Sequence, residues 1–145
     1  MARHTQRHEQ NPRAAEITFG CEIECFLPRG SVRIGGYHAG LELGGRFPRG
    51  WNAQRDGSLQ TSLAGYEGVE IVSPVLRGRE GIEQVRQVAR LLEEMGAKVN
   101  RTCGFHVHLG STSIAGENFD EVADCVRRLI NTTAQHEKAF YGAAG

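Results

Sequence analysis

Residues 19–26 read FGCEIECF, a pattern typical of a β-strand whose two faces differ. Alternate side chains of a strand point to the same face, so Glu22 and Glu24 share one face and the apolar residues around them share the other. Acidic residues are poor strand formers, and two neighbouring carboxylates repel each other unless a cation or water lies between them. We therefore expect a strand at about residues 16–27 with one apolar face and one acidic face that needs a positive partner.

Two other apolar segments carry ionisable residues with the same alternation. In GYEGVEIVSPVL at residues 65–76, Glu70 lies between two apolar side chains, and a proline ends the run. In NRTCGFHVHLG at residues 100–110, His106 and His108 share one strand face and the apolar residues share the other. The two histidines are either polar residues on the wet face of a half-buried sheet, or metal or phosphate ligands, which would need further ligands nearby.

The composition sets limits on the class of protein. The chain has 145 residues, about the size of one domain, and 17 basic residues balance 17 acidic ones, so no overall field attracts nucleic acid or a membrane surface. It has no apolar run of membrane-spanning length and no signal-type segment at its start, so we expect a soluble, cytoplasmic protein. Its cysteines lack C-x-x-C spacing, which favours free thiols over disulfides or a thiolate zinc site: Cys21, Cys25, Cys103 and Cys125.

Much of the first half of the chain has little periodicity. Residues 1–15 are polar and unpatterned, which predicts a flexible N-terminal arm ahead of a domain at residues 16–145. Residues 28–66 are rich in Gly and Arg, with a weak strand expected at about 32–38 and a turn at Asp56. A loop of this length in a compact domain is more often functional than inert, but it lacks the motif of a P-loop.

Two segments in the second half have helical periodicity. Residues 79–95 predict an amphipathic helix that stops at Gly96, and residues 118–142 predict another that starts with Asn118 and Glu121 in capping-box positions. The order strand, loop, strand, helix, strand, helix predicts an α+β layer with helices on one face and ionisable groups on the other. The expected core stripes are Ile82, Val85, Ala89, Leu92 and Met95 in the first helix and Val122, Cys125, Val126, Leu129 and Ile130 in the second.

Four motifs occur one after another along the chain. They are Glu22-x-Glu24, WNAQRDGSL at residues 51–59, GVEIVSPVLRGREG at residues 68–81, and NRTCGFHVHLG. Together they resemble the amidoligase family, which belongs to the carboxylate–amine ligase superfamily of glutamine synthetase and glutamate–cysteine ligase. The resemblance covers about residues 17 to 142. It implies a glutamine-synthetase-like antiparallel sheet with helices on one face and a concave, metal-binding face.

The resemblance also implies a reaction and a set of site residues. The reaction is ATP-dependent ligation, in which a small-molecule or peptide carboxylate is phosphorylated to an acyl phosphate and an amine then displaces phosphate. Magnesium or manganese ions would bridge the nucleotide phosphates, and carboxylates are hard oxygen donors suited to these ions. Carried over by position, the metal ligands would be Glu22, Glu24, Glu70 and His106, and His108 would lie near the transferred phosphate.

The loop supplies three further candidates. We assign Asp56, with His108, to catalysis, and Arg55 and Trp51 to cofactor binding. Guanidinium groups grip carboxylates and phosphates in two-pronged fashion, although a solvated loop arginine is an alternative for Arg55. Trp51 could instead anchor the loop, and Asp56 could be only a turn residue.

Other classes of function remain open. Family members continue through a downstream half that supplies further metal ligands and ATP-binding arginines, so we expect a partial amidoligase domain here. A non-catalytic metal- or nucleotide-binding domain derived from this fold is therefore an alternative. A cupin or hydrolase built on H-x-H fits less well, because the Glu or Asp that those enzymes place after the second histidine is absent. An unfinished sheet edge would favour a homo-oligomer.

Overall fold

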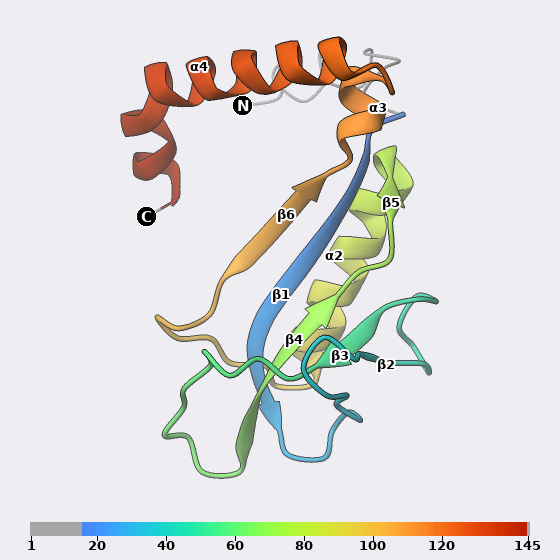
Figure 1. Cartoon of the computed structure of the whole chain (residues 1–145). Coiled ribbons are helices and arrows are strands. Elements are labelled where there is room, and N and C mark those ends of the chain that lie inside the picture. The colour runs from blue at the N-terminus through green and yellow to red at the C-terminus, as the bar shows by residue number, and fades with distance from the viewer. Residues whose placement is uncertain (1–15, 145) are drawn as a thin grey trace, which may run out of the picture. The chain divides into compact units, whose positions relative to one another are not determined.

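The computed structural model describes residues 16–144, which form two compact units divided between Leu109 and Gly110. The predicted arm at residues 1–15 lies outside the described residues. No helix of the described part is long and apolar enough to cross a membrane. The elements of the first unit, drawn in Figure 1, are β1 (Thr18–Pro28), β2 (Leu41–Glu42), β3 (Asn52–Gln54), β4 (Tyr66–Val72), β5 (Leu76–Arg77), α2 (Gly78–Glu94) and β6 (Phe105–Leu109).

The strands form one open, antiparallel sheet. Five strands follow the order β2-β3-β4-β1-β5, and β6 also pairs with β1. Glu22 of β1 pairs with both Val72 of β4 and His106 of β6, so β1 lies between these two strands (Figure 1). Every strand pair is antiparallel, and the first unit therefore confirms the predicted α+β class.

The hydrophobic core lies between the sheet and α2. The apolar alternation of β1 is confirmed, because Cys21, Cys25 and Leu27 are buried against Val88 and Leu92 of α2. The helix is rotated relative to the predicted stripe, since Ile82 and Ala89 are exposed and Val88 and Leu91 are buried instead. The reason lies at Gly81, where an added Cβ would come within 2.8 Å of Leu76 and 3.0 Å of Phe19. The glycine lets this side of α2 approach the sheet, so the neighbouring positions on that side become the core.

The strands and helices end close to the positions that the sequence predicts, except in the long loop. Pro74 follows the end of β4, and Gly96 takes a left-handed φ of 81° just after α2, as expected of a helix stop. The strand predicted at residues 32–38 is wrong. The loop instead forms the short strands β2 and β3, which pair with each other, and residues 32–38 contribute only a single bridge at Gly36.

The second unit contains α3 (Ser111–Ala115) and α4 (Phe119–Ala144). The backbone N–H of Asp120 donates a 2.9 Å hydrogen bond to Oδ1 of Asn118, which confirms Asn118 as the N-cap of α4. The apolar stripe of α4 does not have the predicted burial, because Val126, Leu129 and Ile130 are exposed. Periodicity alone shows that a helix has an apolar side, but it does not show which element packs against that side.

The four cysteines are free, and the two on β1 are buried. Burial, with a smaller effect of Cys103, raises the pKa of Cys25 to about 12. Burial also raises the pKa of Cys21, which a hydrogen bond with Ser73 partly offsets. The thiolate is the reactive form, so we expect Cys103 and Cys125 to react first with a thiol reagent at pH 8 and Cys21 and Cys25 to react only on unfolding. Mass spectrometry of the alkylated native chain checks this order, and early labelling of Cys25 would contradict it.

Candidate metal centre

The polar face of the sheet brings together ionisable side chains from β1, β4 and β6 and a side-chain amide from β3. Directly opposed residues of antiparallel strands share a face, and the register opposes Gln54 to Glu70, Glu70 to Glu24, and Glu22 to His106. This row therefore crosses β3, β4, β1 and β6 on the side of the sheet away from α2. The period-2 alternation of each strand places apolar residues in the core and these groups together on the other face.

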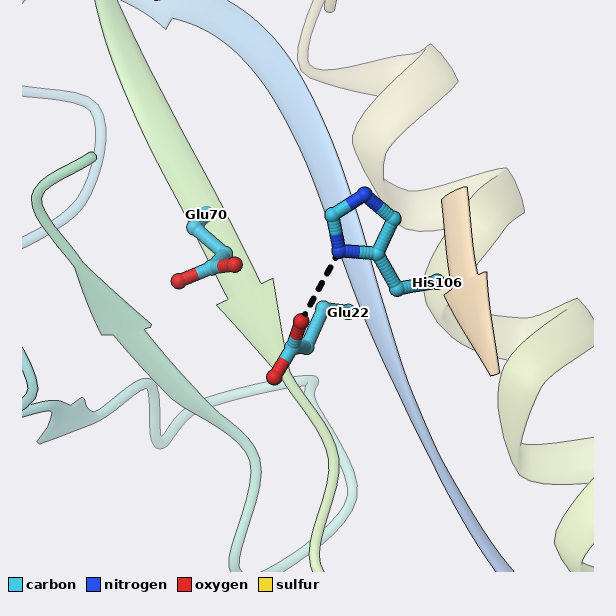
Figure 2. Close-up of side chains that lie close together, drawn as sticks. All are labelled: Glu22, Glu70 and His106. Atoms are coloured by element: carbon cyan, nitrogen blue, oxygen red, sulfur yellow. Dashed lines mark hydrogen bonds and ion pairs between the residues drawn. The ribbon is translucent and has the colours of Figure 1, made fainter. Parts of the chain in front are cut away.

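Glu22, Glu70 and His106 form a first group of potential metal ligands (Figure 2). One ligand atom from each of the three lies within 4.8 Å of the other two. The imidazole Nδ1 of His106 lies 3.1 Å from Oε2 of Glu22 in a hydrogen bond, and His108 Nε2 lies 3.2 Å from Oε1 of the same carboxylate. Both histidines therefore share Glu22, as expected for side chains on one strand face.

Glu24, Asp56 and Glu70 form a second group with the same mutual spacing of 4.8 Å or less. Glu24 is only 6% exposed and Glu70 only 9%, whereas carboxylates are almost never this buried without a partner. The backbone N–H of Gly104 donates a 2.6 Å hydrogen bond to Oε2 of Glu24. Glu70 belongs to both groups, so its carboxylate lies between two potential cation positions.

Two of these carboxyl groups have lowered pKa values. For Asp56, the backbone N–H of Ser58 donates a hydrogen bond that holds the pKa below its usual value, although burial opposes the shift. For Glu22, burial raises the pKa, but hydrogen bonds and charge interactions with His106 and His108 outweigh it and the net pKa is lowered. Both carboxyl groups are thus held in the ionised form that a cation requires.

The donor set fits a hard divalent cation. It consists of four carboxylates and an imidazole brought together on a half-buried surface, and Glu22, Glu24 and Glu70 repel one another there unless positive charge compensates them. Oxygen-rich sets of this kind suit Mg²⁺ or Mn²⁺, whereas Zn²⁺ sites more often use Cys and His. The arrangement can therefore hold one or two cations and, through them, an anionic reactant.

Comparison with known proteins bears on what this face does. A family model described as "Putative amidoligase enzyme" matches residues 15–145. The chain belongs to the amidoligase family. Neither a curated protein nor a solved structure matched the chain. The family is a family of ligase-type enzymes, and the candidate metal centre contains side chains from all four motifs by which the sequence resembled it.

The structure also locates the other predicted site residues of this amidoligase-family chain. His108 carries an imidazole that is 64% exposed, at the edge of the candidate centre. Arg55 and Asp56 line an open pocket of about 520 Å³ together with Arg29, Gly57, Leu59, Gln60, Thr61, Tyr66, Glu67 and Gly68. Trp51 is fully buried in the core, and its indole Nε1 donates a 3.3 Å hydrogen bond to Gln84 of α2. This burial favours the alternative role of Trp51 as an anchor of the loop.

The sequence assigns Asp56 to catalysis, and it does not identify Gln54, a neighbour of both metal groups. Asp56 lies among the potential ligands because the turn after β3 brings it next to Glu24, a contact between distant parts of the chain. Gln54 donates a 2.6 Å hydrogen bond to Glu70, and its strand position opposite Glu70 was the available signal. At Gly104 the sequence allows either a close backbone approach or an ordinary turn, and the structure shows the close approach: the backbone N–H donates to Glu24, and the lack of a side chain leaves room for His106.

Replacing Gly104 by alanine is expected to weaken metal binding by about tenfold with little loss of stability. An added Cβ would lie 2.7 Å from Nε2 of His106 and 3.3 Å from Oε2 of Glu24, so the imidazole must move away from the carboxylates. Gly104 is not in the left-handed region, and alanine therefore fits its backbone. Calorimetric titration with Mn²⁺ measures the change. Gly57→Ala is the matched control because its Cβ would meet nothing within 4 Å, and equal affinities of the two variants would contradict this account.

Proposed function

We propose that this chain carries the metal-binding part of an ATP-dependent carboxylate–amine ligase. The observation that carries the proposal is the pair of ligand groups on one sheet face, Glu22–Glu70–His106 and Glu24–Asp56–Glu70, in a chain of the amidoligase family. In this proposal the sheet corresponds to part of a glutamine-synthetase-like catalytic domain. Glu22, Glu24, Glu70 and His106 would hold Mg²⁺ or Mn²⁺, with Asp56 as an additional ligand.

The proposed reaction proceeds in two steps, phosphoryl transfer and amide formation. A carboxylate oxygen of the first substrate attacks the γ-phosphorus of ATP, so an acyl phosphate forms and ADP leaves. The amine nitrogen of the second substrate then attacks the acyl carbon, phosphate leaves with the bonding electron pair, and the nitrogen gives up a proton. The bound cations would supply neutralisation of the charge that ATP and a carboxylate bring together.

The side chains near the centre suit the other needs of this chemistry. The exposed imidazole of His108 can donate a hydrogen bond to a transferred phosphoryl group, because no core packing confines it. Arg55 and Arg29 line the pocket that Asp56 also borders, and guanidinium groups bind carboxylates and phosphates. A small-molecule or peptide carboxylate in this pocket would lie beside the second group of ligands.

Trapping with hydroxylamine tests the proposal without knowledge of the natural amine. The chain is incubated with ATP, Mg²⁺, hydroxylamine and a panel of amino acids and dipeptides, and ADP and hydroxamate are measured together. The proposal predicts equal amounts of the two products for at least one acid, and their loss in a folded Glu24→Gln variant. If the chain binds Mn²⁺ and ATP but forms neither product with any acid, the function is that of a non-catalytic metal- and nucleotide-binding domain.

A further inference from the structure

Glu70 holds a particular place among the potential ligands, because it is the residue that both groups contain. A carboxylate between two cations must present its oxygens in fixed directions, and a free glutamate side chain has three rotatable bonds. Glu70 lies on the central part of β4 and is buried, so water does not orient it. A neighbouring donor has to do so.

Gln54 of β3 provides that donor. It is directly opposite Glu70 in the strand register, and its side-chain Nε2 lies 2.6 Å from Oε2 of Glu70. An ionised carboxylate only accepts hydrogen bonds, so the amide must direct its NH₂ group and not its carbonyl oxygen to Glu70. This hydrogen bond restrains one oxygen of the Glu70 carboxylate, Oε2, and does not restrain the other oxygen.

The position of Gln54 is itself determined by the backbone around it. Ala53, the preceding residue, is fully buried in the core and pairs with Ile71 on β4, so the direction of the Gln54 side chain is set by the strand. Gly40 lies on the neighbouring loop, and its missing Cβ, which would lie 3.7 Å from Oε1 of Gln54, leaves room for the amide on that side. The half-buried amide is thus directed by its strand position and by its hydrogen bond to Glu70.

We propose that Gln54 is a positioning residue that orients Glu70 for both cations at once. The inference rests on the proposed function, since it assumes that the two groups bind metal. Residues that hydrogen-bond a metal ligand typically affect affinity by 10- to 100-fold when they are replaced. Gln54 touches neither cation in this scheme and acts through Glu70 alone.

The proposal makes a prediction that differs from those for the ligands themselves. Gln54→Met keeps the length of the side chain and removes the donor, and it is expected to weaken the binding of both Mn²⁺ ions by about tenfold. Glu22→Gln is expected to weaken mainly one ion, and Asp56→Asn mainly the other, because each belongs to a single group. Electron paramagnetic resonance titration with Mn²⁺ counts the bound ions and gives their affinities. Gln87→Met is the matched control, since Gln87 on α2 donates to the backbone of Arg46 and lies outside both groups.

The outcomes separate this proposal from the proposed function. If the wild-type chain binds no Mn²⁺, both are overturned. If it binds Mn²⁺ and Gln54→Met binds it equally well, or loses one ion only, the role of Gln54 alone is overturned. Nuclear magnetic resonance of the wild type gives an answer even if the variant does not fold. The side-chain amide signals of Gln54 should shift on addition of Mg²⁺ while those of Gln87 stay in place, and an unmoved Gln54 would overturn the proposal.

Discussion

A Glu70→Gln variant is expected to lose binding of both metal ions, with an affinity lowered by about 100-fold or more, beyond the range seen when a ligand's supporting partner is removed. The amide keeps the shape of the side chain and removes the negative charge that both groups share. The same change should not destabilise the metal-free fold. It removes a buried charge that faces Glu24 across the strand pair, so the melting temperature in EDTA should stay level or rise.

Two measurements check this expectation together. Calorimetric titration with Mn²⁺ gives the affinity, and thermal unfolding with and without EDTA gives the stability. Glu42→Gln is the matched control, because Glu42 accepts a 2.8 Å hydrogen bond from the backbone of Gly50 but belongs to neither ligand group. A Glu70→Gln variant that is folded and binds Mn²⁺ like the wild type would show that the shared carboxylate is not a ligand.

Trp51→Ala is expected to destabilise the fold by about 3–5 kcal/mol, as large aromatic-to-alanine changes in cores do. The indole is fully buried and is one of the largest side chains of the core, and it also donates a hydrogen bond to Gln84. Its removal leaves a cavity between the sheet and α2, and the side-chain amide of Gln84 loses its hydrogen-bond donor. Urea denaturation followed by circular dichroism measures the free energy of unfolding.

Trp51→Phe separates the core role from cofactor binding. It keeps most of the apolar volume, so it should cost less stability than alanine and leave nucleotide binding unchanged. Ala53 is a neighbouring core position, and Ala53→Gly provides a control that lowers stability without touching an aromatic ring. A Trp51→Phe chain with wild-type stability that no longer binds ATP would restore Trp51 to the cofactor site.

The alternation within each strand allowed the sequence to predict which residues share the polar face. Each of these residues lies between two apolar neighbours in the sequence: Glu22 and Glu24 on β1, Glu70 on β4 and His106 on β6. Because strands have a period of two, the faces follow from local sequence once the strands are paired. The structure places these residues together, and their role as ligands stays a prediction.

The features that the sequence did not predict depend on contacts between distant parts of the chain. The sequence predicts the turn at Asp56 but not the approach of Asp56 to Glu24 and Glu70, and the same loop places Trp51 in the core. The face of α2 was misplaced because Gly81, not a larger residue, makes the closest approach to the sheet. Local patterns describe a residue's own element, whereas these three positions are set by what another element brings next to them.

The acidic strand residues conflict with the local preferences of a sheet, and such conflicts are most often found at functional sites. Glu22 and Glu24 would be replaced by apolar or hydroxyl residues if stability alone were served. Instead, Glu24 is buried beside Glu70 and Glu22 is half-buried, so the carboxylates form a surface whose mutual repulsion a bound divalent cation would relieve. The cost in stability and the proposed metal binding would therefore have the same origin.

The most direct test of the account is titration of the wild-type chain with Mn²⁺, followed by electron paramagnetic resonance. The two ligand groups predict up to two bound ions per chain, removed by EDTA and joined by ATP in a complex that forms only with metal. A folded chain that binds no Mn²⁺, with or without ATP, would contradict the account, and the polar face would then be a set of hydrogen-bonded residues without a metal.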